Sequence, residues 1–208
     1  MNLLTKNKIN DNFFIEKLIP KYITTEKVIN NEFFFVTDNN NLTSTLFFLK
    51  KHSLTQLKLL TDICCVDWIY KKKKSTNKKN YNTFYNIDKR FEIIFNFLSV
   101  KYTQRIYLKV YANITTAVNS IISLYSCSNW LEREVWDMFG IYFLNHNDLR
   151  RILTDYGFEG YPLRKDFPLS GYLEVKYYEH VKRVISEAIT LTQEFRHFSF
   201  LSPWEKYE

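Results

Sequence analysis

The chain contains few of the residues that usually form metal and cofactor sites in proteins. Its 208 residues include only 4 glycines, 3 cysteines and 4 histidines. Three cysteines fit neither a zinc site nor a disulfide framework, and an iron–sulfur cluster needs about four thiolate ligands. No two histidines have the spacing of three or four residues that places two metal ligands on one helix face. The residues concerned are Cys64, Cys65, Cys127, His52, His146, His180 and His197. The sequence therefore predicts no catalytic, cofactor-binding or metal site in this chain.

Other motifs are also missing. Gly157 and Gly160 do not have the spacing of a dinucleotide-binding loop, and Ser170 does not lie in a nucleophile elbow. No stretch reaches the roughly 18 apolar residues that a membrane helix needs. The first arginine is Arg90, so an arginine-rich transit peptide is not expected. We expect a protein that either works where it is made or was recorded without its leader.

Aromatic and basic residues are abundant instead. Phenylalanine, tyrosine and tryptophan make up 18% of the chain, and the formal net charge is +7. Part of this charge lies in Lys71–Lys74, Lys78 and Lys79, which are surrounded by Asn, Ser and Thr and are typical of a solvated loop. A basic nucleic-acid-binding protein is the main alternative function, and a steep salt dependence of nucleic-acid binding would distinguish it.

Hydrophobic periodicity predicts an α+β fold for the first part of the chain. A helix is expected at each of two stretches with apolar residues at helical spacing, and strands where β-branched and aromatic residues alternate or run together. Consecutive strands with short links favour a mixed or antiparallel sheet with helices on one face. The expected helices are 13–20 and 42–52, the latter capped by Thr43 or Ser44, and the expected strands are 32–37, 57–68, 91–100 and 105–111. The strand at 57–68 is expected to be buried, with Cys64 and Cys65 as buried free thiols.

A third helix is expected over 129–139. Asn129 is a good N-cap, Glu132 has the position of a capping-box glutamate, and Gly140 is a typical helix end. Arg133 and Asp137 are four residues apart and are expected to pair. Leu131, Val135 and Met138 form the apolar face.

The last part of the chain is ambiguous. Residues 173–189 fit a helix through Val181, Val184, Ile185, Ala188 and Ile189, and fit irregular strands equally well. We divide the chain into a sheet domain at 1–127, a helix and turn-rich interface region at 128–171, and an extended C-terminal tail at 172–208.

Residues 129–168 mix charged side chains of both signs with large apolar ones. Such a mixture is typical of a specific surface that another protein covers. Arg150, Arg151, Arg164 and Lys165 suit phosphate or an acidic partner, and the nearby aromatic residues favour a protein. An acid–base pair at Glu132 and Glu134, as in a free-standing hydrolase, is a further alternative, which turnover by the single chain would support.

The run EREVWDMFGIYFLNHNDLRRILTDYGFEGYPLRKDFPLSGYLEVKY, at 132–177, resembles the signature of a known family. That family is the small hydrophilic subunit of respiratory NADH:quinone oxidoreductase, complex I, known as subunit nine in mitochondrial genomes and as the C subunit in bacteria. The likeness extends from about Leu57 to the ending QEFRHFSFLSPWE. Cys65 stands where the family usually has glycine, and Asn147 stands where proline is usual. Residues 71–80 look like an insertion relative to the family.

The resemblance implies a non-catalytic core subunit of the peripheral arm that supports assembly and electron transfer from NADH to ubiquinone, coupled to proton translocation. It implies an N-terminal α/β domain with an extended C-terminal interaction segment. The implied location is the matrix side of the mitochondrial inner membrane, with the cytoplasmic side of a bacterial membrane as the alternative. FMN, iron–sulfur clusters, NADH and ubiquinone belong to the complex as a whole, and none is expected on this chain.

The implied partners are the large quinone-site subunit and neighbouring iron–sulfur subunits. The residues that the resemblance and the mixed surface assign to the family motif or to subunit contacts are Glu132, Arg133, Glu134, Asp137, His146, Arg150, Arg151, Arg164, Lys165, Asp166, Phe167, Pro168 and Trp204.

Overall fold

The computed structural model describes residues 24–29, 32–69, 89–193, 195, 196 and 198. The helix expected at 13–20, the lysine-rich segment 71–80 and Trp204 lie outside these residues. The chain forms two compact units, Met1–Phe167 and Pro168–Glu208. The three-part division expected from the sequence stays a prediction.

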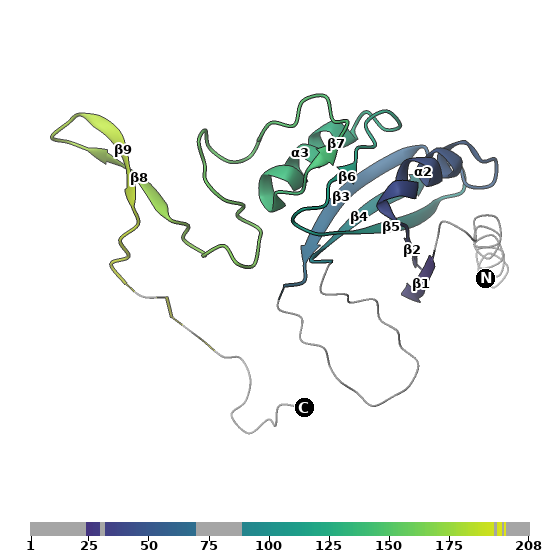
Figure 1. The fold of residues 1–208 in the computed structure, drawn as a ribbon, viewed down its shortest axis with the longest axis horizontal. Helices are drawn as coiled ribbons and strands as arrows, with labels where there is room; N and C mark the ends of the chain where they lie inside the picture. Colours follow the sequence, from purple (N-terminus) through teal and green to yellow (C-terminus); the bar gives the residue numbers. More distant parts are fainter. Residues whose placement is uncertain (1–23, 30–31, 70–88, 194, 197, 199–208) are drawn as a thin grey trace, which may run out of the picture. The chain divides into compact units, whose positions relative to one another are not determined.

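The first unit is built on a five-stranded sheet (Figure 1). Its spatial order is β1-β2-β5-β4-β3. The parallel pairing of β2 with β5 makes the sheet mixed, because its other neighbouring strands are antiparallel. The expectation of a mixed sheet in an α+β fold is therefore confirmed. The strands are β1 Thr24–Ile29, β2 Glu32–Val36, β3 Leu59–Asp67, β4 Phe91–Ser99 and β5 Gln104–Ala112.

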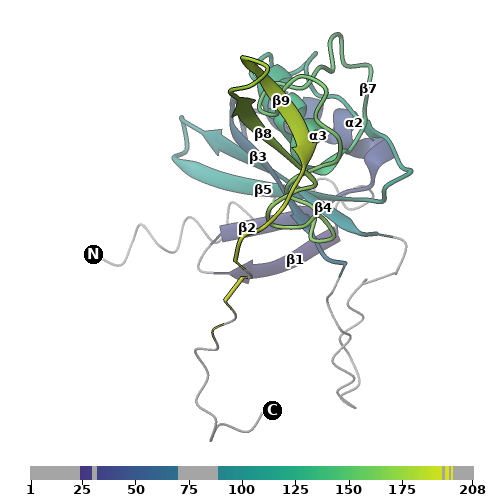
Figure 2. The ribbon, with the colours of Figure 1, turned by 90° about the vertical axis from the view of Figure 1, so that its left-hand side faces the viewer.

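Two α-helices cover one face of this sheet, as Figures 1 and 2 show. They are α2 Leu42–Lys51, preceded by the short 3-10 helix η1 Asn39–Asn41, and α3 Ser128–Phe139. Two short parallel strands, β6 Val118–Asn119 and β7 Phe143–Leu144, flank α3 in the sequence. Buried side chains from both helices and from the sheet belong to one hydrophobic core.

Strict alternation places the core side chains of the two central strands. Ile106, Leu108 and Val110 of β5 are fully buried, as their spacing predicts. They face the same side as Phe95 and Phe97 of β4, because directly paired residues share a face of the sheet. Burial of aromatic and β-branched side chains along both strands supplies most of the driving force for this unit.

Three local expectations are wrong. Thr43 and Ser44 lie inside α2, and Ser44 Oγ donates a hydrogen bond to the Asn41 carbonyl at 3.3 Å instead of capping the helix. The Asn129 cap is also wrong, because α3 begins at Ser128 after Cys127 and has no side-chain cap bond. Strand β3 is not a buried strand, since the thiol-bearing Cys64 is exposed on it.

The second unit contains a β-hairpin where the sequence left helix and strand open. Strand β8, Leu173–Tyr178, pairs antiparallel with β9, Arg183–Ala188. Lys182 has a φ of 51° in the connecting turn. The segment therefore follows the alternation of side chains that is typical of strands, and not the helical spacing of its apolar residues.

Within the described ranges, helices are too short or too polar for any of them to cross a bilayer.

The end of α3 provides a test of the fold. Gly140 has a φ of 73°, and a Cβ there would lie 2.6 Å from the Tyr161 ring and against Arg164 Nη2. Gly157 has nearly the same φ, 74°, with nothing within 4 Å of its Cβ position. We expect Gly157→Ala to lose about 1–2 kcal/mol from the left-handed conformation alone. Gly140→Ala should lose clearly more in urea unfolding, and equal losses would contradict the packing described.

Candidate subunit interface around helix α3

Glu132 lies at the centre of a buried polar cluster on α3. Its side chain is fully buried, with Oε2 accepting a hydrogen bond from Ser120 Oγ at 2.6 Å and Oε1 accepting one from the Ile121 N–H at 2.9 Å. Burial raises its pKa, against the opposing effect of these hydrogen bonds and of His146. The expected capping box is therefore wrong, because Glu132 binds the segment before the helix through long-range bonds.

His146 closes the other side of this cluster. Its side chain is buried, and Nε2 lies 4.0 Å from Glu132 Oε2 and 3.3 Å from the Asn129 carbonyl. Nδ1 accepts a hydrogen bond from the Asp148 N–H at 3.1 Å. The ring thus holds the turn after β7 against the first turn of α3.

Asp137 organises the loop that follows. Its Oδ2 accepts hydrogen bonds from three successive N–H groups, those of Ile152, Leu153 and Thr154, at 3.1, 2.7 and 3.0 Å. Its Oδ1 accepts a bond from Thr154 Oγ1 at 2.6 Å. Burial alone would raise the pKa of Asp137, but these bonds outweigh it and leave the pKa below its ordinary value.

The expected pair between Arg133 and Asp137 is wrong. Arg133 Nε donates to the Arg150 carbonyl at 3.0 Å, whereas the cation nearest to Asp137 is Arg151, with Nη1 3.7 Å from Oδ1. Arg150 is exposed and pairs with Asp148 at 2.6 Å. The spacing of four residues on the helix therefore does not determine the partners of Asp137, because the N–H groups of the following loop bind its carboxylate instead.

Arg164 binds its own loop to the C-terminal end of α3. Its Nε donates to the Phe139 carbonyl at 2.5 Å, and the guanidinium lies over the Tyr161 ring, 4.2 Å from the centroid. Burial, and next the charge of Arg90, lower its pKa. Much of this side chain therefore serves the fold of the first unit.

An ion cluster joins this segment to the sheet. Arg90 forms two hydrogen bonds with Asp67, at 3.0 and 2.6 Å, and its Nη2 also lies 2.9 Å from Asp166 Oδ1. The N–H of Lys165 donates to Asp67 Oδ2 at 3.1 Å. Sequence analysis missed Arg90 and Asp67. Antiparallel pairing of β3 with β4 brings them together, since Asp67 is opposite Phe91 in the register.

Three further motif residues are Glu134, Phe167 and Pro168. Glu134 is exposed on α3, so it does not share an environment with the buried Glu132. Phe167 packs against the Phe158 ring at 5.9 Å between centroids. Pro168 begins the second unit. In the part of the chain that the structure covers, no three His, Cys, Asp or Glu side chains gather as a metal site would require.

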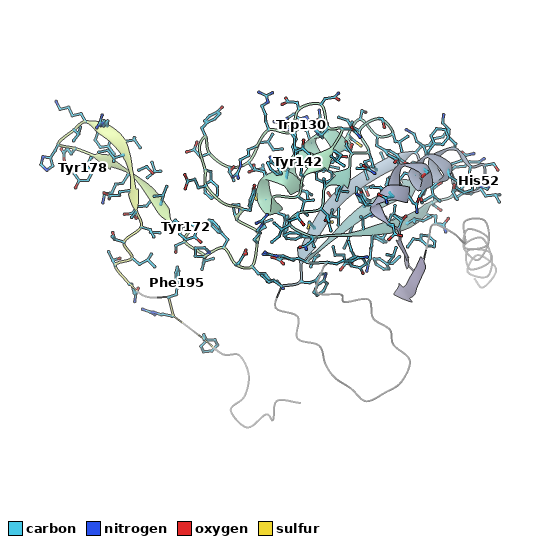
Figure 3. The ribbon with its side chains drawn as sticks, viewed as in Figure 1. His52, Trp130, Tyr142, Tyr172, Tyr178 and Phe195 are labelled. Atoms are coloured by element: carbon cyan, nitrogen blue, oxygen red, sulfur yellow. The ribbon has the colours of Figure 1, made fainter. Side chains whose placement is uncertain are left out.

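Large apolar side chains remain outside these buried clusters. Trp130 is 68% exposed on α3 and Tyr142 is exposed just beyond it (Figure 3). Leu153, Tyr156 and Leu163 are exposed on the loops that Asp137 and Arg164 hold. Several exposed apolar groups on a fixed, charged framework are typical of a surface that binds another protein.

The fold and these clusters define a protein of the α+β class with an organised, partly apolar outer surface. Residues 35–173 match the model of the family described as "Respiratory-chain NADH dehydrogenase, 30 Kd subunit". The chain belongs to this family. It is a subunit of the NADH:ubiquinone oxidoreductase complex, and other subunits of that complex are its partners. The comparisons give no support to the nucleic-acid alternative.

Named relatives agree with this assignment. The chain is 47% identical to NADH-ubiquinone oxidoreductase subunit 9 of Reclinomonas americana over 192 residues, which cover 92% of this chain and 86% of the relative. It is 53% identical to NADH dehydrogenase [ubiquinone] iron-sulfur protein 3 of Beta trigyna over 161 residues, covering 77% and 76%.

The fold also occurs in solved structures. One of them is a chain of the membrane-bound sulfane sulfur reductase, an archaeal respiratory membrane complex, with a TM-score of 0.59 and 18% identity over 77% of this chain and 86% of that chain.

Asp137 gives a stability prediction with a matched control. Asp137→Asn keeps the shape of the side chain but removes the charge that three N–H groups share, so we expect a loss of about 1–3 kcal/mol in the free energy of unfolding. Asp148→Asn, at an exposed pair, should lose much less. Urea unfolding of both full-length variants measures this, and similar losses would show that the loop does not depend on Asp137.

Glu132 gives a prediction about pH. Because its folded-state pKa is raised above the ordinary 4.5, its stabilising contribution is complete below that value and is lost as pH rises through the folded pKa. Glutamine does not titrate. The free energy of unfolding of Glu132→Gln, minus that of the native chain, should therefore increase with pH over this window, and a constant difference would contradict the burial.

Proposed function

We propose that this chain is a non-catalytic scaffold of the peripheral arm of NADH:ubiquinone oxidoreductase. It supports assembly and electron transfer without holding a redox cofactor, because FMN, iron–sulfur clusters, NADH and ubiquinone are bound by other subunits. Its specific partners are the large quinone-site subunit and neighbouring iron–sulfur subunits. Its location is the matrix side of the mitochondrial inner membrane.

The observation that carries this proposal is the uncovered hairpin of the second unit. Alternation along the paired strands gives it one apolar face, formed by Leu173, Val175, Tyr177, Val184 and Ala188, with Ser186 among them. Val175 is 63% exposed and Val184 is 62% exposed. A two-stranded hairpin is marginally stable alone, so an apolar face of this kind favours a protein partner.

The opposite face of the hairpin has a different character. Lys176 forms ion pairs with Glu187 and, at 3.9 Å, with Glu174. Ile185 and Tyr178 share this face with the charged pairs, so the face with Leu173, Val175 and Val184 is the more apolar one and the preferred side for a partner. Tyr172 just before β8 and Tyr178 at its end, both labelled in Figure 3, add exposed aromatic side chains.

The surface around α3 supports the same proposal in the first unit. Glu132, Asp137 and His146 are directed inward, so their part in assembly is to hold the surface that a partner binds. Exposed Trp130 and Tyr142 are the side chains suited to direct contact, because aromatic residues are enriched among those that dominate binding energy. The family motif thus combines residues that position a surface with residues that meet the partner.

Two substitutions on the hairpin test the proposal. We expect Val175→Asp to lower the amount of assembled oxidoreductase, seen on native gels, by at least about tenfold, since a buried unpaired carboxylate costs more than the 1.4 kcal/mol that this factor represents. Val181→Asp is the control, because Val181 is 50% exposed in the connecting turn and outside the apolar face.

The thermal melt of the full-length chain should be the same for both variants, because neither side chain belongs to the core of the first unit. Full assembly by Val175→Asp would contradict the role of the hairpin. A flavin or cluster signal that stays with the purified single chain would contradict the cofactor-free scaffold.

A further inference from the structure

A cluster of cations at one end of the first unit has no role in the interface around α3. This basic corner comprises Lys51 at the end of α2, Lys58 before β3, Lys101 in the β4–β5 turn and Arg105 at the start of β5. All four are exposed. His52, labelled in Figure 3, marks the same end of the unit.

The fold brings these residues together from segments far apart in the sequence. Leu59 of β3 is opposite Leu98 of β4, which is opposite Arg105 of β5, so Lys58 and Arg105 lie at the same end of the sheet. Tyr102 Oη donates to the Ser53 carbonyl at 2.7 Å. That bond ties the β4–β5 turn, with Lys101, to the loop between α2 and β3.

The charge of the basic corner is not balanced locally. Residues 50–60 and 98–105, which form it, contain no aspartate or glutamate. Among the described residues, no carboxylate lies within ion-pair distance of its four cations. Lys101 Nζ lies 5.2 Å from the centroid of the neighbouring Tyr102 ring, which leaves its charge unneutralised. Lys50 differs, because it donates a hydrogen bond to the Leu124 carbonyl.

Aliphatic side chains stand between these cations. Leu54 is 51% exposed in the α2–β3 loop and Val100 is 67% exposed in the β4–β5 turn. Leu59 is also exposed. Solvated lysines alone would need no such neighbours, whereas a protein contact usually has an apolar centre and a charged rim.

We propose that the basic corner binds an acidic segment of a neighbouring subunit, whose carboxylates pair with Lys51, Lys58 and Lys101 and whose apolar side chains cover Leu54 and Val100. The positive charge of the corner favours an acidic partner. Placing like charges together at an interface costs several kcal/mol, whereas opposite charges fix the relative position of the two partners. The cations are fixed on helix and strand ends at defined spacings, which suits pairing with individual carboxylates better than contact with a fluid lipid surface.

Zero-length crosslinking of the native complex tests this. A carbodiimide joins a lysine to a carboxylate only where the two are in contact, so mass spectrometry should find Lys51, Lys58 or Lys101 linked to Asp or Glu of another subunit. The inference rests on the chain being part of the assembled complex. Absence of the chain from the complex would contradict the proposed function, whereas an assembled chain without these crosslinks would contradict only the basic corner.

Charge reversal supplies the second measurement. The triple variant Lys51→Glu, Lys58→Glu and Lys101→Glu should lower the yield of the assembled complex at least about tenfold. The control, Lys71→Glu, Lys72→Glu and Lys73→Glu, makes the same change in net charge in the lysine-rich segment and should assemble normally. An unchanged thermal melt of the triple variant shows that its loss is not unfolding.

Three results would overturn the inference. One is equal loss of assembly in both triple variants, which would show an effect of net charge alone. Another is rapid acetylation of all three lysines in the native complex, which would show that the corner remains in water. The third is crosslinking of these lysines to a photoactivatable anionic phospholipid in place of protein, which would assign the corner to a membrane surface.

Discussion

Helix α3 holds the first unit's outer surface through two carboxylates that accept hydrogen bonds from the backbone of other segments. Glu132 binds the segment before the helix, and Asp137 binds three successive N–H groups after it. Inside a low-dielectric core such bonds are strong, and each unsatisfied backbone group would carry a desolvation penalty. The loops therefore have a defined shape although they contain almost no regular secondary structure.

The ion cluster at the sheet end extends the same arrangement. Arg90 and Asp67 are fixed by strand pairing, and they in turn hold the backbone and side chain of the segment at Lys165 and Asp166. Arg164 adds a bond to the end of α3. A surface that must match a partner's shape is thus assembled from polar contacts on a rigid sheet and helix.

Local periodicity predicted much of this fold. The alternation in β5, the apolar spacing of α3 and the left-handed Gly140 all follow from rules that act within a few residues. The roles of Glu132 and Asp137 could not be predicted in this way, because their hydrogen-bond donors lie 11 or more residues away and most of them are backbone groups without a sequence signature. Arg90 and the basic corner depend on strand register, which is a tertiary property. Function itself came from the family resemblance, since the composition indicated only an interaction protein.

The parallel pair in the centre of the sheet has a consequence for biosynthesis. Strand β2 leaves the ribosome long before β5, yet its inner edge is completed only when β5 arrives, after α2, β3 and β4 have been made. Until then the nascent chain presents an open strand edge that invites wrong pairing. The parallel pairing of β2 can therefore form only after most of the first unit has been synthesised.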